Sequence, residues 1–105
     1  MKKINNMEYI EIVKFKLKEG ITDAQFIKAE QMLRDKGMNN FKGYVGRELY
    51  KCEDGQWSNI VRFDSKKTMT DFLDSLKAHK PVGFIVYGSM IDFSSARLEF
   101  FTKLI

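Results

Sequence analysis

The chain has 105 residues, a formal charge of +4, and 44% hydrophobic with 30% charged side chains. That length suits one domain with a buried core, and the composition is that of a globular protein without a low-complexity or disordered segment. Basic and acidic residues are interspersed, which disfavours a nucleic-acid-binding surface because such surfaces gather Lys and Arg on one face.

The N-terminal third predicts a strand followed by a helix. Within residues 8 to 17, apolar side chains alternate with lysines from residue 13 onward, which is the period of a half-buried strand. Thr22 and Gln25 have the spacing of a capping box that begins a helix. Gly37 is expected to end that helix in a left-handed conformation.

The centre of the chain predicts a β-hairpin. The segments 43–51 and 57–63 are rich in Tyr, Val, Ile, Trp and Phe, which favour strands. Between them, the pair Asp54-Gly55 is expected to supply the positive φ angles of a tight turn.

A second helix and a closing strand follow the hairpin. Asp64 or Ser65 is a candidate cap for a helix whose apolar residues fall at i, i+3, i+4 and i+7. Residues 81–91 are compatible with a strand or a short helix, and we favour the short extra helix. Residues 92–95 predict a turn, and residues 96–105 alternate as the last strand.

The order strand, helix, hairpin, helix, strand predicts one α+β domain over residues 1–105. We expect a ferredoxin-like βαββαβ arrangement, with a four-stranded antiparallel sheet and its helices on one face. The face expected under the helices is apolar and carries Val13, Phe15, Leu17, Val45, Leu49, Trp57, Val61, Phe63, Leu98 and Phe100.

The opposite face of the predicted sheet is also partly apolar. It carries Ile10, Ile12, Tyr44, Tyr50, Ile60, Phe101 and Ile105 beside Glu48, Arg62, Arg97 and Glu99. Because a contiguous apolar patch on a small domain marks an interface, we expect a homodimer packed through this sheet face, with Glu48 and Arg97 setting its register.

Location can be predicted from what the chain lacks. No apolar run approaches the length of a membrane span, and the residues after Met1 lack the apolar stretch of a secretion signal. Cys52 is the only cysteine, which excludes an intrachain disulfide and a thiolate metal cluster. We expect a cytoplasmic protein that does not associate with a membrane.

Three polar side chains are candidates for a functional site. Arg47 is predicted on the helix-covered face, where a charge is unfavourable unless it meets an anionic ligand, an internal Asp or Glu, or solvent. Asn59 shares that face and either positions a ligand oxygen or bonds a backbone group in the core. His79 follows Leu76 by three residues and acts as a base or ligand, or bonds the last carbonyls of its helix. Tyr87 lies in the ambiguous segment, a candidate lid.

Three stretches, residues 60–67, 69–76 and 91–101, carry a likeness to a known family. Together with the hairpin they resemble the dimeric α+β barrel superfamily and, within it, small proteins grouped with the antibiotic biosynthesis monooxygenases. The resemblance implies a pocket between sheet and helices that binds an apolar or aromatic small molecule. It also implies oxidation by molecular oxygen with no metal, flavin or other cofactor in some members, which need only orient a substrate anion and stabilise its charge.

The resemblance also implies individual site residues. Asn59 matches an Asn on the third strand of the family, and His79 lies near the haem-ligand position of haem-degrading relatives. Phe63 stands where oxidative members commonly carry Trp, and Phe72 where many carry His. The expected catalytic residues are Asn59 and His79, and the expected ligand contacts are Arg47, Trp57, Phe63, Phe72 and Tyr87.

Three functions are compatible with this pattern. The first is a monooxygenase-like protein that binds, and in its catalytic form oxidises, an aromatic molecule. The second is a haem-binding or haem-degrading protein with His79 as axial ligand. The third is a non-catalytic dimer whose pocket is filled by its own side chains.

Overall fold

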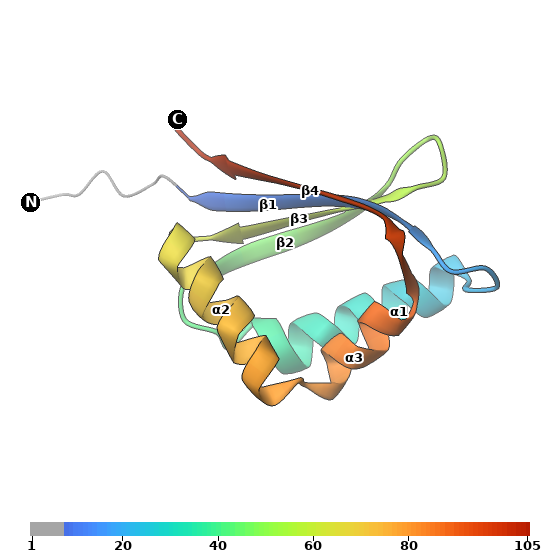
Figure 1. Cartoon of the computed structure of the whole chain (residues 1–105), viewed down its shortest axis with the longest axis horizontal. Helices are drawn as coiled ribbons and strands as arrows, with labels where there is room; N and C mark the ends of the chain where they lie inside the picture. Colours follow the sequence, from blue (N-terminus) through green and yellow to red (C-terminus); the bar gives the residue numbers. More distant parts are fainter. Residues whose placement is uncertain (1–7) are drawn as a thin grey trace, which may run out of the picture.

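The computed structural model describes residues 8–105 as one sheet with a layer of helices on one side (Figure 1). Residues 1–7, on which the expected absence of a secretion signal partly rests, lie outside the described residues. The elements are β1 (Tyr9–Leu17), α1 (Asp23–Leu33), the π-helix η1 (Arg34–Met38), β2 (Tyr44–Lys51), β3 (Trp57–Phe63), α2 (Lys66–His79), α3 (Val82–Ser89) and β4 (Ile91–Thr102).

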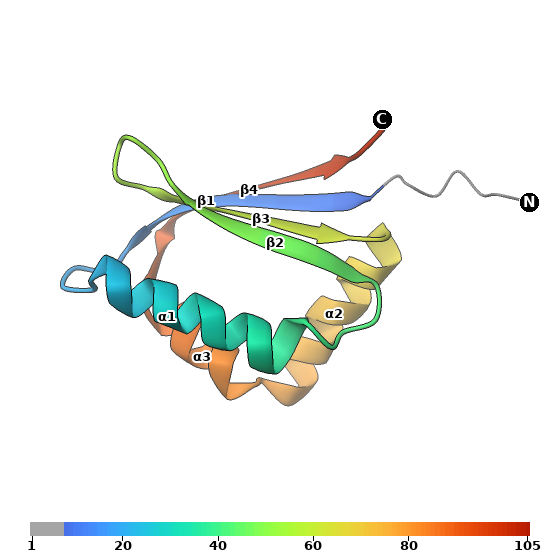
Figure 2. The same ribbon diagram turned by 180° about the vertical axis from the view of Figure 1, so that it is seen from behind.

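The sheet has the predicted ferredoxin-like topology. Its strand order is β2-β3-β1-β4, and all neighbouring strands are antiparallel. Seen from behind, α1, α2 and α3 lie together below the same sheet face (Figure 2). The opposite face is not covered by any element of the described chain, and no described helix is long and apolar enough to cross a membrane.

Local sequence determines where the helices begin. The Thr22 hydroxyl accepts a hydrogen bond from the Gln25 N–H at 3.1 Å, and the Gln25 side chain accepts one from the Thr22 N–H at 2.8 Å. This is the predicted capping box. Ser65, rather than Asp64, caps α2, because its hydroxyl accepts from the Thr68 N–H at 3.1 Å. The predicted short extra helix is confirmed as α3.

Two glycine predictions change in the structure. Gly37 does not end α1, since the helix continues through η1 to Met38. A Cβ at Gly37 would lie 2.8 Å from Phe84 Cε2, so glycine is needed there for close packing. In the hairpin turn, only Gly55 has a positive φ, of 87°, and the Asp54 carboxylate instead accepts from the Gln56 N–H at 3.0 Å.

The predicted turn at residues 92–95 lies inside β4. The register between β1 and β4 shifts between Lys14 and Lys16, so the strand continues through an irregularity. There the Asp92 carboxylate accepts hydrogen bonds from the Ser94 N–H at 3.1 Å and the Ser94 hydroxyl at 2.6 Å. The hydrogen bonds of a turn are therefore present, but they form a bulge within β4 and do not end the strand.

A second register shift corrects the predicted faces of β2. It falls between Tyr44 and Gly46, and it places Tyr44 on the helix side with its ring centroid 6.4 Å from that of Phe63. Val45 is exposed instead of buried. The extra residue in the strand reverses the side on which each of these two side chains falls.

Leu98 and Phe100 are also more exposed than predicted. Both lie on the helix side of β4, yet they are 52% and 43% exposed. Because β4 is an edge strand, its C-terminal half has a neighbour on one side only, and no described helix packs closely over it.

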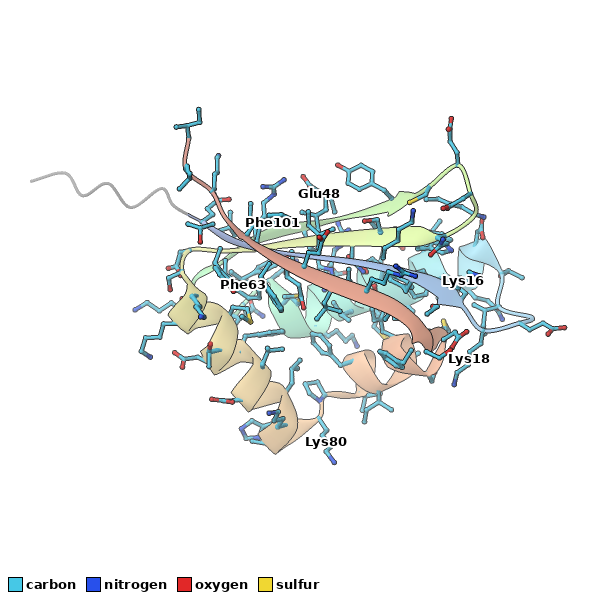
Figure 3. All side chains as sticks on the ribbon, turned by 45° about the horizontal axis from the view of Figure 1, so that its top comes forward. Lys16, Lys18, Glu48, Phe63, Lys80 and Phe101 are labelled. Atoms are coloured by element: carbon cyan, nitrogen blue, oxygen red, sulfur yellow. The ribbon has the colours of Figure 1, made fainter. Side chains whose placement is uncertain are left out.

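The core lies between the sheet and the helices, and aromatic side chains dominate it. Phe26 of α1 is fully buried, with its ring centroid 5.6 Å from Phe15, 5.1 Å from Trp57 and 4.8 Å from Tyr87. Figure 3 shows Phe63 on the helix side of the sheet and Glu48 on the opposite side. The helix layer and the sheet are therefore joined through rings that also border the site described next.

Candidate functional site

A cavity of about 310 Å³ lies between the sheet and α3. Its volume is at the lower end of the ~300–1,000 Å³ that small-molecule sites occupy. Most of its wall is apolar, and the lining side chains come from β1, β2, β3, α3 and β4: Glu11, Val13, Phe15, Arg47, Asn59, Val61, Phe84, Tyr87, Gly88, Ile91, Phe93, Ala96 and Leu98.

Strand register brings three of the polar side chains to the same face of the sheet. Val61 of β3 pairs with Glu11 on β1 and with Arg47 on β2, so these two side chains flank it on the helix side. Asn59 lies two residues before Val61 and points to the same side. Tyr87 reaches the site from α3, on the helix side of the sheet.

An internal carboxylate neutralises Arg47. Its Nε and Nη2 atoms donate to the two carboxylate oxygens of Glu30 at 2.6 and 2.9 Å, and the Arg34 Nε donates to Glu30 at 2.7 Å. The side chains of Arg47 and Glu30 are only 5% and 3% exposed. Of the alternatives for Arg47, the structure therefore shows the internal Glu.

Burial and ion pairing act in opposite directions on these groups. Burial disfavours the charged form of Glu30, but the charge of Arg47 and the hydrogen bonds from Arg34 and Arg47 outweigh it and hold the pKa of Glu30 below its ordinary value. Burial raises the pKa of Tyr87 far above its ordinary value, so its phenol is neutral.

The Asn59 amide is hydrogen-bonded to Tyr87. The Tyr87 hydroxyl accepts from Arg47 Nη2 at 3.2 Å. The Asn59 Nδ2 donates to the same hydroxyl. Its Oδ1 is buried and has no hydrogen-bond partner within residues 8–105. An unmet buried acceptor costs about 1–3 kcal/mol, so it calls for an explanation.

Only part of the predicted site meets at the cavity. Arg47, Asn59 and Tyr87 line it, whereas Trp57, Phe63, Phe72 and His79 do not. Trp57 is a core residue against Phe26, and Phe63 and Phe72 pack on each other with ring centroids 5.6 Å apart. His79 is exposed on the last turn of α2, just before Lys80 ends the helix with a φ of 42°. The apolar stripe of α2 thus leaves the core before it reaches His79.

Sequence reasoning missed two carboxylates, Glu11 and Glu30. The position of each in the sequence indicated that it faces the core. Glu11 has the same parity as Val13 on β1. Glu30 follows Phe26 by four residues and precedes Arg34 by four, which places it on the buried side of α1. Burial raises the pKa of Glu11, and the charge of Arg47 partly opposes this.

Comparison with known proteins adds the fold family. No protein-family model matches the chain, and no curated protein sequence matches it. Several solved structures do. One is a putative antibiotic biosynthesis monooxygenase from Bordetella bronchiseptica, with a TM-score of 0.75 and 16% identity over 94% of this chain and 99% of that chain.

Two further structures come from Streptomyces. SnoaB, described as a cofactor-independent oxygenase from Streptomyces nogalater, matches with a TM-score of 0.72 and 13% identity over 94% of this chain and 95% of that one. A monooxygenase from the gene ActVA-Orf6 of Streptomyces coelicolor, solved with the ligand nanaomycin D, matches with a TM-score of 0.65 and 12% identity over 95% and 90%.

The chain therefore shares the fold of these solved structures, which include proteins described as monooxygenases or as an oxygenase. The fold that the sequence resemblance implies is confirmed. At identities of 12% to 16% the likeness concerns architecture, and the residues of the site have to be argued from this chain itself.

Proposed function

We propose that this protein is monooxygenase-like and binds an aromatic small molecule in the cavity between its sheet and α3. The observation that carries the proposal is the Asn59 Oδ1 atom, a buried acceptor without a partner in the described chain, in the wall of an apolar cavity. A ligand that donates a hydrogen bond to Asn59 would satisfy it. The fold neighbours support a small-molecule role, since one of them was solved with nanaomycin D.

The cavity walls suit a flat ring. Phe84, Tyr87 and Phe93 present aromatic surface, and Val13 and Val61 form part of an apolar sheet side. Burial of apolar ligand surface contributes about 25 cal/mol per Å², and stacked or edge-on rings add about 0.5–1.5 kcal/mol per pair. Binding would thus come from the rings and orientation from the polar wall.

Binding can be measured with the protein's own fluorophore. Trp57 is the only tryptophan, and it contacts Phe26, which stacks on Tyr87 of the cavity wall. Titration with a hydroxyanthraquinone should therefore quench Trp57 fluorescence. Asn59→Ala should weaken binding by roughly tenfold, the loss expected for one buried hydrogen bond.

A matched control lies on the same strand. Ser58→Ala changes a side chain on the opposite sheet face and should leave the affinity unchanged. Circular dichroism would confirm that both variants are folded. The proposed site would be contradicted if the wild-type protein showed no saturable quenching. It would also be contradicted if Asn59→Ala and Ser58→Ala bound the ligand with equal affinity.

We propose further that a bound electron-rich ligand is oxidised by molecular oxygen without metal or flavin. An anthrone is a suitable probe, because loss of a proton from its CH₂ group gives an anion that reacts with oxygen directly. One dioxygen converts the CH₂ to C=O and leaves the second oxygen in water. Protein-dependent uptake of one oxygen per anthrone would support this step. Binding without uptake would limit the protein to a binding role.

We also propose that two copies of the chain pack through the bare sheet face. Ile10, Ile12 and Ile60 are half-buried there, and Tyr50 and Phe101 are 51% and 43% exposed. An apolar surface of this kind is typical of an interface. Glu48 and Arg62, paired at 3.2 Å on the same face, would be available for its polar contacts.

Light scattering at micromolar concentration tests this interface. The wild-type protein should have the mass of two chains, and Ile60→Arg should have the mass of one. Val82→Arg is the control, because Val82 is an equally apolar but 71% exposed residue on α3, away from the sheet face. A wild-type protein with the mass of one chain would overturn the dimer.

The two alternative functions receive less support. Haem binding would need His79 as ligand, and this side chain is exposed and outside the cavity wall. Haemin titration of the wild-type and His79→Ala proteins would detect such a role by a Soret shift that only the wild type shows. A pocket filled by its own side chains is disfavoured by the cavity of about 310 Å³.

A further inference from the structure

We propose that Glu11 makes the cavity selective for ligand charge, so that it accepts aromatic molecules bearing hydroxyl or amino donors and rejects carboxylates and other anions. This inference rests on the proposed ligand-binding function and adds the chemical class of the ligand. It depends on two acceptors in the cavity wall, the Glu11 carboxylate and the Asn59 amide oxygen.

Glu11, which is half-buried, differs from the buried Glu30 in the partners of its side chain. Glu30 accepts hydrogen bonds from Arg34 and Arg47. The Glu11 side chain makes no hydrogen bond or ion pair with any residue from 8 to 105, and Glu11 lines the cavity. A half-buried carboxylate without a partner is unfavourable, and a donor on a bound ligand would relieve it.

No charged side chain around the cavity is hydrogen-bonded to Glu11, although the charge of Arg47 acts on it at a distance. Arg47, on β2, is the cation in the wall, and both oxygens of Glu30 from α1 already engage it. Tyr87, on α3, is neutral because burial raises its pKa. The side chains that β3 and β4 contribute to the described wall carry no charge. When Glu11 is ionised, its carboxylate is therefore the charge in the described wall that has no hydrogen-bonded counter-charge.

The second acceptor makes the same demand on the ligand. Asn59 is only 2% exposed, its Nδ2 donates to the Tyr87 hydroxyl, and its Oδ1 has no hydrogen-bond partner within residues 8–105. A ligand oxygen without a proton would meet two acceptors here. A ligand with a donor toward each would satisfy both at once.

The selectivity should depend on pH. Burial raises the pKa of Glu11, and Arg47 opposes that rise. As the pH falls through this raised pKa, Glu11 gains a proton, loses its charge and becomes a donor itself. Rejection of anionic ligands should then fade, while Glu30, with its lowered pKa, stays ionised.

Three probes with one ring system separate charge from shape. Anthraquinones carrying an amino, a hydroxyl or a carboxyl group at the same carbon are titrated by Trp57 quenching at neutral pH. The carboxylate should bind roughly tenfold more weakly than the amine, since like charges brought together at a half-buried site repel each other. Glu11→Gln keeps the side-chain shape and should remove most of that difference.

A control and a second measurement keep the test decisive. Glu19→Gln changes an exposed acid outside the cavity and should preserve the wild-type preference. In the wild type, affinity for the carboxylate probe should rise as the pH is lowered, even if Glu11→Gln does not fold. If all three probes bind equally, or if the preference survives in folded Glu11→Gln, charge selection is wrong while ligand binding stands. If none binds, the proposed function fails as well.

Discussion

The ion pair between Glu30 and Arg47 should be a major determinant of stability, and Glu30→Gln tests it. Gln has nearly the same shape as Glu and can still accept a hydrogen bond, so the substitution removes mainly the negative charge. What remains is an Arg47 guanidinium whose side chain is 5% exposed and whose charge has lost its partner.

The expected effect is large for a domain of this size. Breaking one side of a buried ion pair costs about 3–5 kcal/mol, and we expect the lower end because Gln keeps an acceptor for Arg47. Against a typical total of ~5–15 kcal/mol, this is a considerable share of the free energy of unfolding. At ~4–8 °C per kcal/mol, the Tm should fall by roughly 12–24 °C.

Urea unfolding followed by circular dichroism measures the loss, at one fixed protein concentration because dissociation of a dimer would shift the midpoint. The control is a double-mutant cycle made of Glu30→Leu, Arg47→Met and the combined Glu30→Leu, Arg47→Met variant. The double variant should lose less free energy of unfolding than the two single losses added together, by about 2 kcal/mol or more. Single losses that simply add, or a Glu30→Gln midpoint equal to wild type, would refute the buried-pair reasoning.

The same pair should make stability depend on pH in a defined direction. The folded-state pKa of Glu30 is lowered, so its contribution is fully present above its unfolded pKa of about 4.3. That contribution is lost as the pH falls through the lower folded value. The acid-side loss of stability should therefore be smaller in Glu30→Gln than in the wild type.

Three further changes have expected outcomes. The folded-state pKa of Glu11 is raised, so its unfavourable effect appears as the pH rises; Glu11→Gln should therefore stabilise the protein at neutral pH but not in acid, as urea midpoints would show. Gly43 has a φ of 91° and its Cβ position meets Thr68, so Gly43→Ala should destabilise by about 1–3 kcal/mol. Ser65→Ala removes the cap of α2 and should lower the free energy of unfolding by about 1 kcal/mol, with Thr70→Ala, inside the helix, as a milder comparison.

Most of the fold follows from local signals in the sequence. The alternation that starts at Val13, the capping box at Thr22 and the hairpin around Gly55 each depend on a few neighbouring residues, and each is present in the structure. The register shift at Tyr44 is different. A one-residue slip depends on how β2 pairs with β3, so the pattern of β2 alone contains no signal for it. The larger shift between Lys14 and Lys16 had a local signal, the turn residues 92–95, but the sequence did not show that the strand continues through them.

The candidate site was predictable only where sheet parity decides it. Arg47 and Asn59 sit at inward-facing strand positions, so periodicity alone placed them under the helices. Trp57 and Phe63 have the same parity as Asn59, but they lie at the two ends of β3, where Phe26 and Phe72 cover them. Which inward position borders empty space depends on where the helices sit, and this is a tertiary property.

The two acids Glu11 and Glu30 show why the charge of the site needed a structure. Glu11 is half-buried and Glu30 is buried, and their pKa values shift in opposite directions. The difference comes from Arg34 and Arg47, whose hydrogen bonds and charges hold Glu30 in its ionised form. From sequence, Arg47 was compatible with an anionic ligand, an internal acid or solvent, and the structure shows the internal acid Glu30. The polar atoms left for a ligand are acceptors, so recognition in this cavity has to start from donors on the ligand.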